Sequence, residues 1–337
     1  MLSKILEVED LKVEFHTYRG VVKALNGVSF MVEKGEVFGL AGETGSGKSV
    51  TGLAIQRLLP SNAVVVGGRI MFDGRDLLNL KEEEMNKIRG KEMTAVFQDP
   101  HTYLNPVFKM QDQFRDILLV NDREIASIKD KRAIKKAVNN RIIQMLTEVQ
   151  MPAPERVAKM YPHELSGGMK QRMMLAMAFS LRPKLIIADE PTTALDVTIQ
   201  AQVLELMKSL QRKYDTSVIL ITHDLGVIAE TCRRIAVMYA GRIIEMGNVD
   251  SVYAKPLHPY TQGLMRALPR ADKDLKVESI GGSVPDLVEL PPGCPFHPRC
   301  PHAMEVCRKT NPRTLKIDGR VVECHLYDEE ITEGRVA

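Results

Sequence analysis

The expected fold is decided by one stretch near the start of the chain, Gly42-Glu43-Thr44-Gly45-Ser46-Gly47-Lys48-Ser49. An apolar run precedes it at residues 37–40, and a helix-like segment follows from Val50 to Leu59. Strand, glycine-rich loop and helix form the context of a phosphate-binding loop, and they favour it over a glycine-rich turn without a ligand. The glycines let successive backbone N–H groups turn toward anionic oxygens. Lys48 is then expected to bind the β- and γ-phosphates of a nucleotide, and Ser49 to ligate Mg²⁺ beside the helix N-terminus.

The length and composition fit a soluble protein with a sizeable core. A chain of 337 residues suits one large domain with an appendage, or two domains. Its net charge of +3 is spread over interspersed acidic and basic residues, so charge alone does not indicate nucleic acid. No apolar run approaches the roughly 20 residues of a membrane span, and the acidic N-terminal residues argue against a signal peptide. We therefore expect a cytosolic protein that reaches a membrane only through partners.

Alternating apolar residues predict strands around the loop. Leu11, Val13 and Phe15 alternate with polar residues, and residues 28–32 repeat this period after a turn at Asn26-Gly27. Apolar runs at residues 184–189, 217–222 and 234–239 predict buried strands. The expected fold class is therefore α/β, with a small antiparallel β subdomain before the loop.

The pattern between residues 104 and 161 is different. Apolar residues recur there at helical spacing, with lysines and arginines largely opposite. This predicts a helical subdomain inserted between the halves of the α/β domain. We interpret the basic face as a solvated helix surface rather than a nucleic-acid or lipid patch. Beyond about residue 254 prolines multiply, which indicates a domain boundary.

Two further motifs carry chemistry. Asp189 and Glu190 end an apolar run, where Asp189 could hold the Mg²⁺ shell and Glu190 could polarise a water that attacks the γ-phosphate. The alternative is an Asp-Glu pair that caps the turn before Pro191. A second helix start follows Ser166, a plausible N-cap whose neighbouring glycines allow an anion close to free N–H groups. This second motif consists of Leu165, Ser166, Gly167, Gly168 and Met169.

Taken in order, these motifs resemble the ATP-binding cassette family over about residues 5 to 255. They are the loop, Gln98 after its strand, the Leu165–Met169 signature, the strand end at Asp189-Glu190, Ala194-Leu195-Asp196, and His223. The resemblance implies a P-loop NTPase cassette at residues 1–255, with the helical subdomain and signature at about 104–180. It also implies that Gln98 senses Mg²⁺ and the γ-phosphate, and that His223 contacts that phosphate. Glu190, His223 and Gln98 would be the catalytic residues.

The same resemblance implies a dimer. The signature of one cassette would complete the ATP site of the other, and Asp196 would lie at the interface between them. Adenine would stack on an aromatic residue ahead of the loop. Phe15 and Tyr18 are both candidates, and a core role for Phe15 is an equal rival.

Finer motifs resemble the ATP-binding subunits of oligopeptide and dipeptide importers. They are Phe97-Gln98-Asp99-Pro100, residues 191–202, residues 223–229 and His258-Pro259-Tyr260-Thr261. The resemblance implies an ATPase at the cytoplasmic face of the membrane that powers solute uptake. Its partners would be a second ATPase subunit (a copy or a paralogue), two transmembrane permeases and an external solute-binding protein, with no nucleic acid. The solute stays open between dipeptides, oligopeptides, nickel and sugars.

Four cysteines gather in the extension at residues 256–337, namely Cys294, Cys300, Cys307 and Cys324. Four thiolates suit an iron–sulfur cluster or a zinc ion, and the lack of a Cys-x-x-Cys pair weakens a zinc ribbon. The importer resemblance favours a [4Fe–4S] cluster, with zinc as the alternative and disulfides or plain thiols still open. Substitute ligands would be His297, His302 and His325.

Two other functions compete with this one. One is a soluble ATPase of this family that acts on nucleic acid or ribosomes, with the cysteines as a repair-type metal site. Such relatives usually carry two cassettes or a long coiled coil, and neither is present. The other is a metal-binding regulatory module that keeps ATP only for structure, which the presence of Glu190 and His223 disfavours.

Overall fold

The computed structural model describes residues 3–193, 195–267 and 280–333. The chain divides into two compact units. The first unit comprises Met1–Ile5, Glu33–Glu36 and Asn79–Ile219. The second comprises Leu6–Val32, Val37–Leu78 and Leu220–Ala337. The phosphate loop therefore lies in the second unit, whereas the signature and the Asp189-Glu190 strand end lie in the first.

An antiparallel sheet forms the N-terminal part of the second unit. It has the order β2-β1-β4-β5, and β1 pairs with β4 so that Leu6 lies opposite Phe72. Leu11 and Val13 are fully buried, as their alternation predicted, because they face the same side of β1. The strands are β1 (Lys4–Thr17), β2 (Gly20–Glu33), β4 (Ala63–Phe72) and β5 (Arg75–Asp76).

A second sheet leads into the phosphate loop. In the second unit its order is β11-β12-β10-β9-β3, with β3 parallel to β9 and the other pairs antiparallel. All of β3 is buried, which explains its continuous apolar sequence. The C-terminal hairpin β11–β12 thus extends the sheet that carries the loop. The strands are β3 (Val37–Ala41), β9 (Arg234–Tyr239), β10 (Arg242–Asn248), β11 (Thr314–Ile317) and β12 (Arg320–Glu323).

Helices of the second unit pack against this second sheet. Helix α10 contacts β3, and α11 contacts β9 and β10. The helices of the second unit are α1 (Lys48–Gln56), α10 (Leu225–Thr231), α11 (Val249–Ala254), α12 (Pro259–Arg266) and α13 (Glu329–Glu333). Short 3-10 turns occur at Leu77–Asn79, His297–Arg299, Val306–Arg308 and His325–Tyr327.

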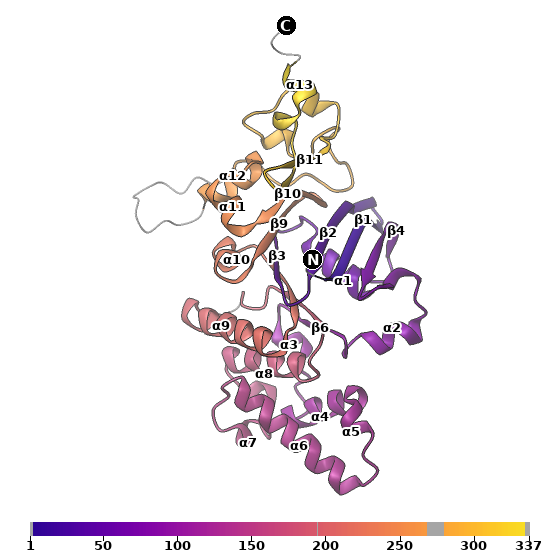
Figure 1. Ribbon diagram of the computed structural model, residues 1–337, viewed down its shortest axis with the longest axis vertical. Coiled ribbons are helices and arrows are strands. Elements are labelled where there is room, and N and C mark those ends of the chain that lie inside the picture. Colours follow the sequence, from indigo (N-terminus) through magenta and orange to yellow (C-terminus); the bar gives the residue numbers. More distant parts are fainter. Residues whose placement is uncertain (1–2, 194, 268–279, 334–337) are drawn as a thin grey trace. The chain divides into compact units, whose positions relative to one another are not determined.

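The first unit is mostly helical, as residues 104–161 predicted. Figure 1 shows its helices α4, α6, α7 and α8 gathered in one part of the unit. Its helices are α2 (Glu82–Ile88), α3 (Pro100–Tyr103), α4 (Met110–Asn121), α5 (Arg123–Ala126), α6 (Lys131–Glu148), α7 (Pro154–Val157), α8 (Gly167–Phe179) and α9 (Val197–Tyr214), with a 3-10 turn at Pro162–Glu164. Strands β6 (Met93–Val96) and β7 (Leu185–Asp189) pair in parallel, and β8 (Ser217–Thr222) leads into the second unit.

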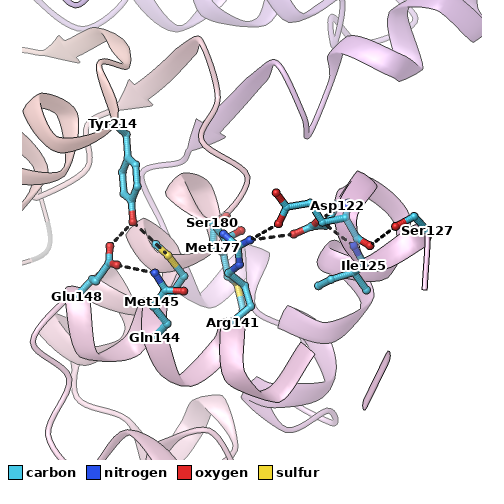
Figure 2. Close-up of polar contacts among 11 residues, drawn as sticks. Asp122, Ile125, Ser127, Arg141, Gln144, Met145, Glu148, Met177, Ser180 and Tyr214 are labelled. Carbon is cyan, nitrogen blue, oxygen red and sulfur yellow. Dashed lines mark hydrogen bonds and ion pairs between the residues drawn. The ribbon is translucent and has the colours of Figure 1, made fainter. Parts of the chain in front are cut away.

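Polar contacts hold the long helix α6 near its middle, at Arg141, and at its end, at Glu148 (Figure 2). Arg141 pairs with Asp122 at 3.7 Å and with Glu124 at 3.2 Å. At the far end of α6 the Tyr214 hydroxyl, from the end of α9, donates to Glu148. Burial and this hydrogen bond raise the pKa of Tyr214 to about 12, so the phenol stays a donor. None of the described helices is long and apolar enough to cross a bilayer.

Candidate nucleotide-binding site

The loop between β3 and α1 has the backbone that a phosphate-binding loop requires. Gly42, Gly45 and Gly47 have φ values of 148°, 83° and 104°, which residues with side chains rarely adopt. A Cβ at Gly42 would lie 2.3 Å from the Met238 carbonyl oxygen, and one at Gly47 would lie 2.8 Å from Leu25 Cδ2. Side chains are therefore excluded at two of the three glycines by packing as well as by φ.

Two polar groups of the loop suit an anionic ligand. Lys48 is 5% exposed, and its ammonium donates to the carbonyl oxygens of Gly42 at 2.7 Å and Glu43 at 2.9 Å. This places the cation over the loop at the start of α1. The Ser46 hydroxyl is buried without a hydrogen-bond partner, which a bound polar group would relieve. The loop therefore fits the phosphates of ATP.

Glu43 has two partners outside the loop that the sequence did not predict. Its carboxylate accepts two hydrogen bonds from Arg299, and its backbone N–H donates to the Tyr260 hydroxyl at 2.9 Å. Neither residue was a candidate from the sequence. The only signal was the His258-Pro259-Tyr260-Thr261 motif, which carried no assigned role.

The other candidates of the second unit are exposed or half-buried. His223 follows the buried strand β8 and precedes Asp224, which caps α10 by accepting from Gly226 N at 2.8 Å. Its ring is exposed at the junction of strand and helix. Tyr18 is 99% exposed at the turn after β1, whereas Phe15 is half-buried within β1. Both remain predictions for the adenine contact.

In the first unit two predicted catalytic residues meet. Gln98 Nε2 donates to Glu190 Oε2 at 3.1 Å, although the residues are 92 positions apart. The register explains this contact, because β6 and β7 are parallel with Val96 opposite Ala188, so both strands end at the same edge. Thr193 Oγ1 donates to the same Glu190 oxygen at 2.9 Å. Asp189, the proposed Mg²⁺ ligand, is half-buried at the end of β7.

The signature begins a helix as predicted. Ser166 Oγ accepts from Met169 N at 3.3 Å and caps α8, with Leu165 buried before it. A Cβ at Gly168 would lie 2.7 Å from Ile199 Cγ2, and one at Gly167 would lie 3.4 Å from Leu195 Cδ2. Gly168 therefore lets α8 approach α9, a packing role that the sequence did not predict.

Asp196 also has a local role, because it caps α9 by accepting from Ile199 N at 3.0 Å. Ala194, which belongs to the same motif, lies outside the described residues. The predicted interface role of Asp196 stays a prediction.

The cysteine cluster does not form the predicted metal site. All five cysteines are free thiols, so the structure holds no disulfide between them. Burial raises the pKa of Cys294 to about 11 and of Cys324 to about 12, which keeps these thiols protonated without a cation nearby. Across the described ranges, no group of three or more His, Cys, Asp or Glu side chains is arranged to hold a metal ion. The [4Fe–4S] and zinc predictions are therefore not supported by the structure.

Two of the three histidines proposed as substitute ligands contact backbone instead. One ring nitrogen of His297 lies 3.0 Å from the Cys294 carbonyl oxygen, and one of His325 lies 3.0 Å from that of Thr310. A ring nitrogen that faces a carbonyl oxygen carries a proton, so that nitrogen does not offer a lone pair.

Comparisons with known proteins agree with this geometry. Residues 25–193 match the family described as "ABC transporter", and residues 244–307 match "Oligopeptide/dipeptide transporter, C-terminal region". The chain is 48% identical to the dipeptide transport ATP-binding protein DppD of Bacillus subtilis, over 97% of this chain and 96% of the relative. It is 46% identical to the oligopeptide transport ATP-binding protein OppD of Salmonella typhimurium, over 97% and 95%.

Solved structures also match. The dimeric post-hydrolysis state of the ATP-binding cassette MJ0796, bound to ADP and Pi, superposes with a TM-score of 0.62 and 25% identity, over 72% of this chain and 98% of that structure. The structure of cbiO1 from Clostridium perfringens, part of an ABC transporter complex, gives a TM-score of 0.61 over 75% and 91%.

Proposed function

Because the chain belongs to the ABC transporter family, we propose that it is the ATP-hydrolysing subunit of an importer for dipeptides or oligopeptides. The observation that carries this proposal is the phosphate loop, with Lys48 over it and no room for side chains at Gly42 and Gly47. Near-full-length similarity to dipeptide and oligopeptide transport proteins supports the peptide substrate. It also speaks against the alternative of a nucleic-acid or ribosomal ATPase.

We propose that hydrolysis is mainly positioning and charge neutralisation, as for other phosphoryl transfers. Lys48 would bind the β- and γ-phosphates, with Gly42 to Ser49 enclosing them. Mg²⁺ would neutralise phosphate charge, held by Ser49, Gln98 and Asp189. Glu190 would orient and deprotonate the attacking water, and His223 would contact the γ-phosphate.

We propose that two such subunits share their ATP sites. The start of α8 is exposed at Ser166 and Gly167, which leaves the positive end of this helix accessible to a partner's nucleotide. Asp196 would lie at the same interface. This supports a signature that acts in trans, in a dimer with a copy or a paralogue.

The membrane partners would dock on the first unit. Tyr103 ends α3, and Val107 and Phe108 lie in the loop that follows it. They are 52%, 72% and 54% exposed, an unusual set of apolar side chains close together in the sequence. Gln113 holds this loop by bonding Asn105 N, Asn105 O and Phe108 O. We propose that the loop contacts the permeases, which would place the subunit at the cytoplasmic face of the membrane. An external binding protein would supply the peptide.

We further propose residues 1–255 as the nucleotide-binding domain, with the signature-bearing helical subdomain at about 104–180, and residues 256–337 as an extension that holds a [4Fe–4S] cluster. Support for the cluster comes from four reduced cysteines that lie close together, since Cys294, Cys300 and Cys307 all act on the pKa of Cys324. Iron, sulfide and zinc analysis of anaerobically purified protein tests this. Absence of all three would leave plain thiols.

The transport proposal is tested with the chain, its permeases and its binding protein in liposomes. Labelled dipeptides and oligopeptides should enter the liposomes only when MgATP is present on the side of the membrane that carries the ATPase subunit. Lys48→Ala should abolish this uptake. Uptake that continues at the wild-type rate with Lys48→Ala would contradict the proposal. A complex that hydrolyses ATP in response to nickel or sugars but not peptides would reassign the solute.

A further inference from the structure

The acidic residue of the phosphate loop is bound by the C-terminal extension. Arg299 Nη1 donates to Glu43 Oε2 at 2.7 Å, and Nη2 donates to Oε1 at 3.0 Å. The two side chains are 5% and 31% exposed. This is the two-pronged arrangement in which guanidinium and carboxylate match most closely. The partners are 256 positions apart in the sequence, yet both belong to the second unit.

Further hydrogen bonds and a ring contact hold the guanidinium of Arg299. Its Nε donates to the Gly281 carbonyl oxygen at 2.9 Å, and Nη2 also donates to that of Ile280 at 3.3 Å. The guanidinium lies 5.7 Å from the ring centroid of Tyr239, at the end of β9. The hydrogen bond to Glu43 raises the pKa of Arg299, so the cation persists at every ordinary pH.

A buried aromatic cluster of Tyr239, Tyr260 and Phe296 contacts the same loop through Tyr260. The ring centroids of Tyr260 and Phe296 lie 4.7 Å and 5.2 Å from that of Tyr239, and all three side chains are at most 2% exposed. Tyr260 accepts the Glu43 N–H, and Phe296 lies between Cys294 and Cys300 in the sequence. The extension therefore fixes both the backbone and the carboxylate of Glu43.

The charge of Glu43 poses a problem for a loop that binds phosphates. A carboxylate beside a polyanion repels it, and the repulsion is stronger in a partly buried site than in water. Arg299 offsets this repulsion by pairing with Glu43, and it fixes the carboxylate by binding both of its oxygens.

We propose that Arg299 is a positioning residue of the nucleotide site, through which the extension keeps the phosphate loop receptive to ATP. This inference rests on the proposed function, because it requires that the loop bind ATP. It assigns the extension a role in nucleotide affinity that requires no metal.

The test measures MgATP binding to the full-length chain and, in the assembled transporter, the KM for ATP and kcat. Arg299→Gln leaves Glu43 unpaired beside the phosphates, so affinity should fall by about tenfold, with a matching rise in KM and little change in kcat. Arg299→Lys keeps the positive charge but loses the two-pronged geometry, so its affinity for MgATP should lie between those of the wild type and Arg299→Gln. The control is Arg313→Gln, which loses an ion pair of the same extension, to Asp328 at 2.5 Å, and should bind as the wild type does.

A charge rescue separates positioning from general damage. In the double variant Arg299→Gln/Glu43→Gln no charge is left to repel the phosphates, so affinity should return to within about threefold of the wild type. Wild-type affinity in Arg299→Gln would overturn the proposal, and so would a double variant as weak as the single one. Failure of the proposed function is distinguishable, because then the wild type and Lys48→Ala would bind ATP equally.

Discussion

Glu43 and Glu190 are both predicted site residues, one in each unit, and the partners described for them differ in charge. Glu43 is bound by the guanidinium of Arg299, a permanent cation held at 5% exposure. Glu190 accepts from Gln98 and Thr193, and neither of these donors is charged. The guanidinium of Arg299 binds both carboxylate oxygens of Glu43, whereas Gln98 and Thr193 both donate to one oxygen of Glu190. Glu43 is therefore held by an ion pair in one unit, and Glu190 accepts hydrogen bonds from an amide and a hydroxyl in the other.

The largest expected effect tests the chemical half of this comparison. Glu190→Gln keeps the shape and the contact to Gln98 but removes the base, so steady-state ATP hydrolysis should fall by about 100-fold or more. MgATP binding should persist. Glu43→Gln is the matched control, and it should retain hydrolysis within about threefold because Glu43 is not the proposed base. Phosphate release measures both, and equal losses in the two variants would break the distinction.

The next effect concerns the rigidity of the loop that presents Glu43. Gly42→Ala would bring a Cβ 2.3 Å from the Met238 carbonyl oxygen, so the free energy of unfolding should fall by about 2 kcal/mol. Gly45→Ala shares the positive φ but meets nothing within 4 Å, and it should lose less. Urea unfolding of the two variants isolates the steric clash from backbone strain. If Gly45→Ala lowered the free energy of unfolding as much as Gly42→Ala does, the steric clash at Gly42 would not be the cause.

His258, which contacts the aromatic cluster, makes the stability of the fold depend on pH. His258 is buried beside Phe296, and burial lowers its pKa to about 3 from an ordinary value of 6.5. The unfolded chain therefore takes up a proton at higher pH than the folded one, so this contribution to stability is complete above pH 6.5 and is lost as pH falls toward 3. His258→Asn keeps an acceptor for Tyr260 N and does not titrate.

The matching measurement is thermal unfolding between pH 7 and pH 4. The wild type should lose more stability over this range than His258→Asn does. Parallel curves for the two proteins would show that His258 does not stay neutral in the fold.

The smallest expected effect returns to Glu190. Thr193→Val removes one neutral donor with little change of shape, so the carboxylate keeps the Gln98 contact and kcat should change by at most about fivefold. The hydrolysis rate at saturating ATP checks this. A loss as large as that of Glu190→Gln would mean that Thr193, and not the carboxylate alone, sets the geometry of the water.

The sequence by itself determined the elements and motifs whose signals are local. The glycines at 42, 45 and 47 mark positive φ, the alternation at Leu11 and Val13 marks a half-buried strand, and Ser166 marks a helix start. Each of these depends on residues a few positions apart, so spacing and residue type are enough.

Only the tertiary structure decided which distant side chains meet. Gln98 reaches Glu190 across 92 positions because two parallel strands end together, and Arg299 reaches Glu43 across 256 positions because the extension packs on the sheet that carries the loop. Gly168 likewise leaves room for Ile199, because a Cβ at this position would collide with it. No periodicity encodes such pairs, since their partners are fixed by sheet order and packing. The four clustered cysteines predicted a metal site, and the described residues do not show one.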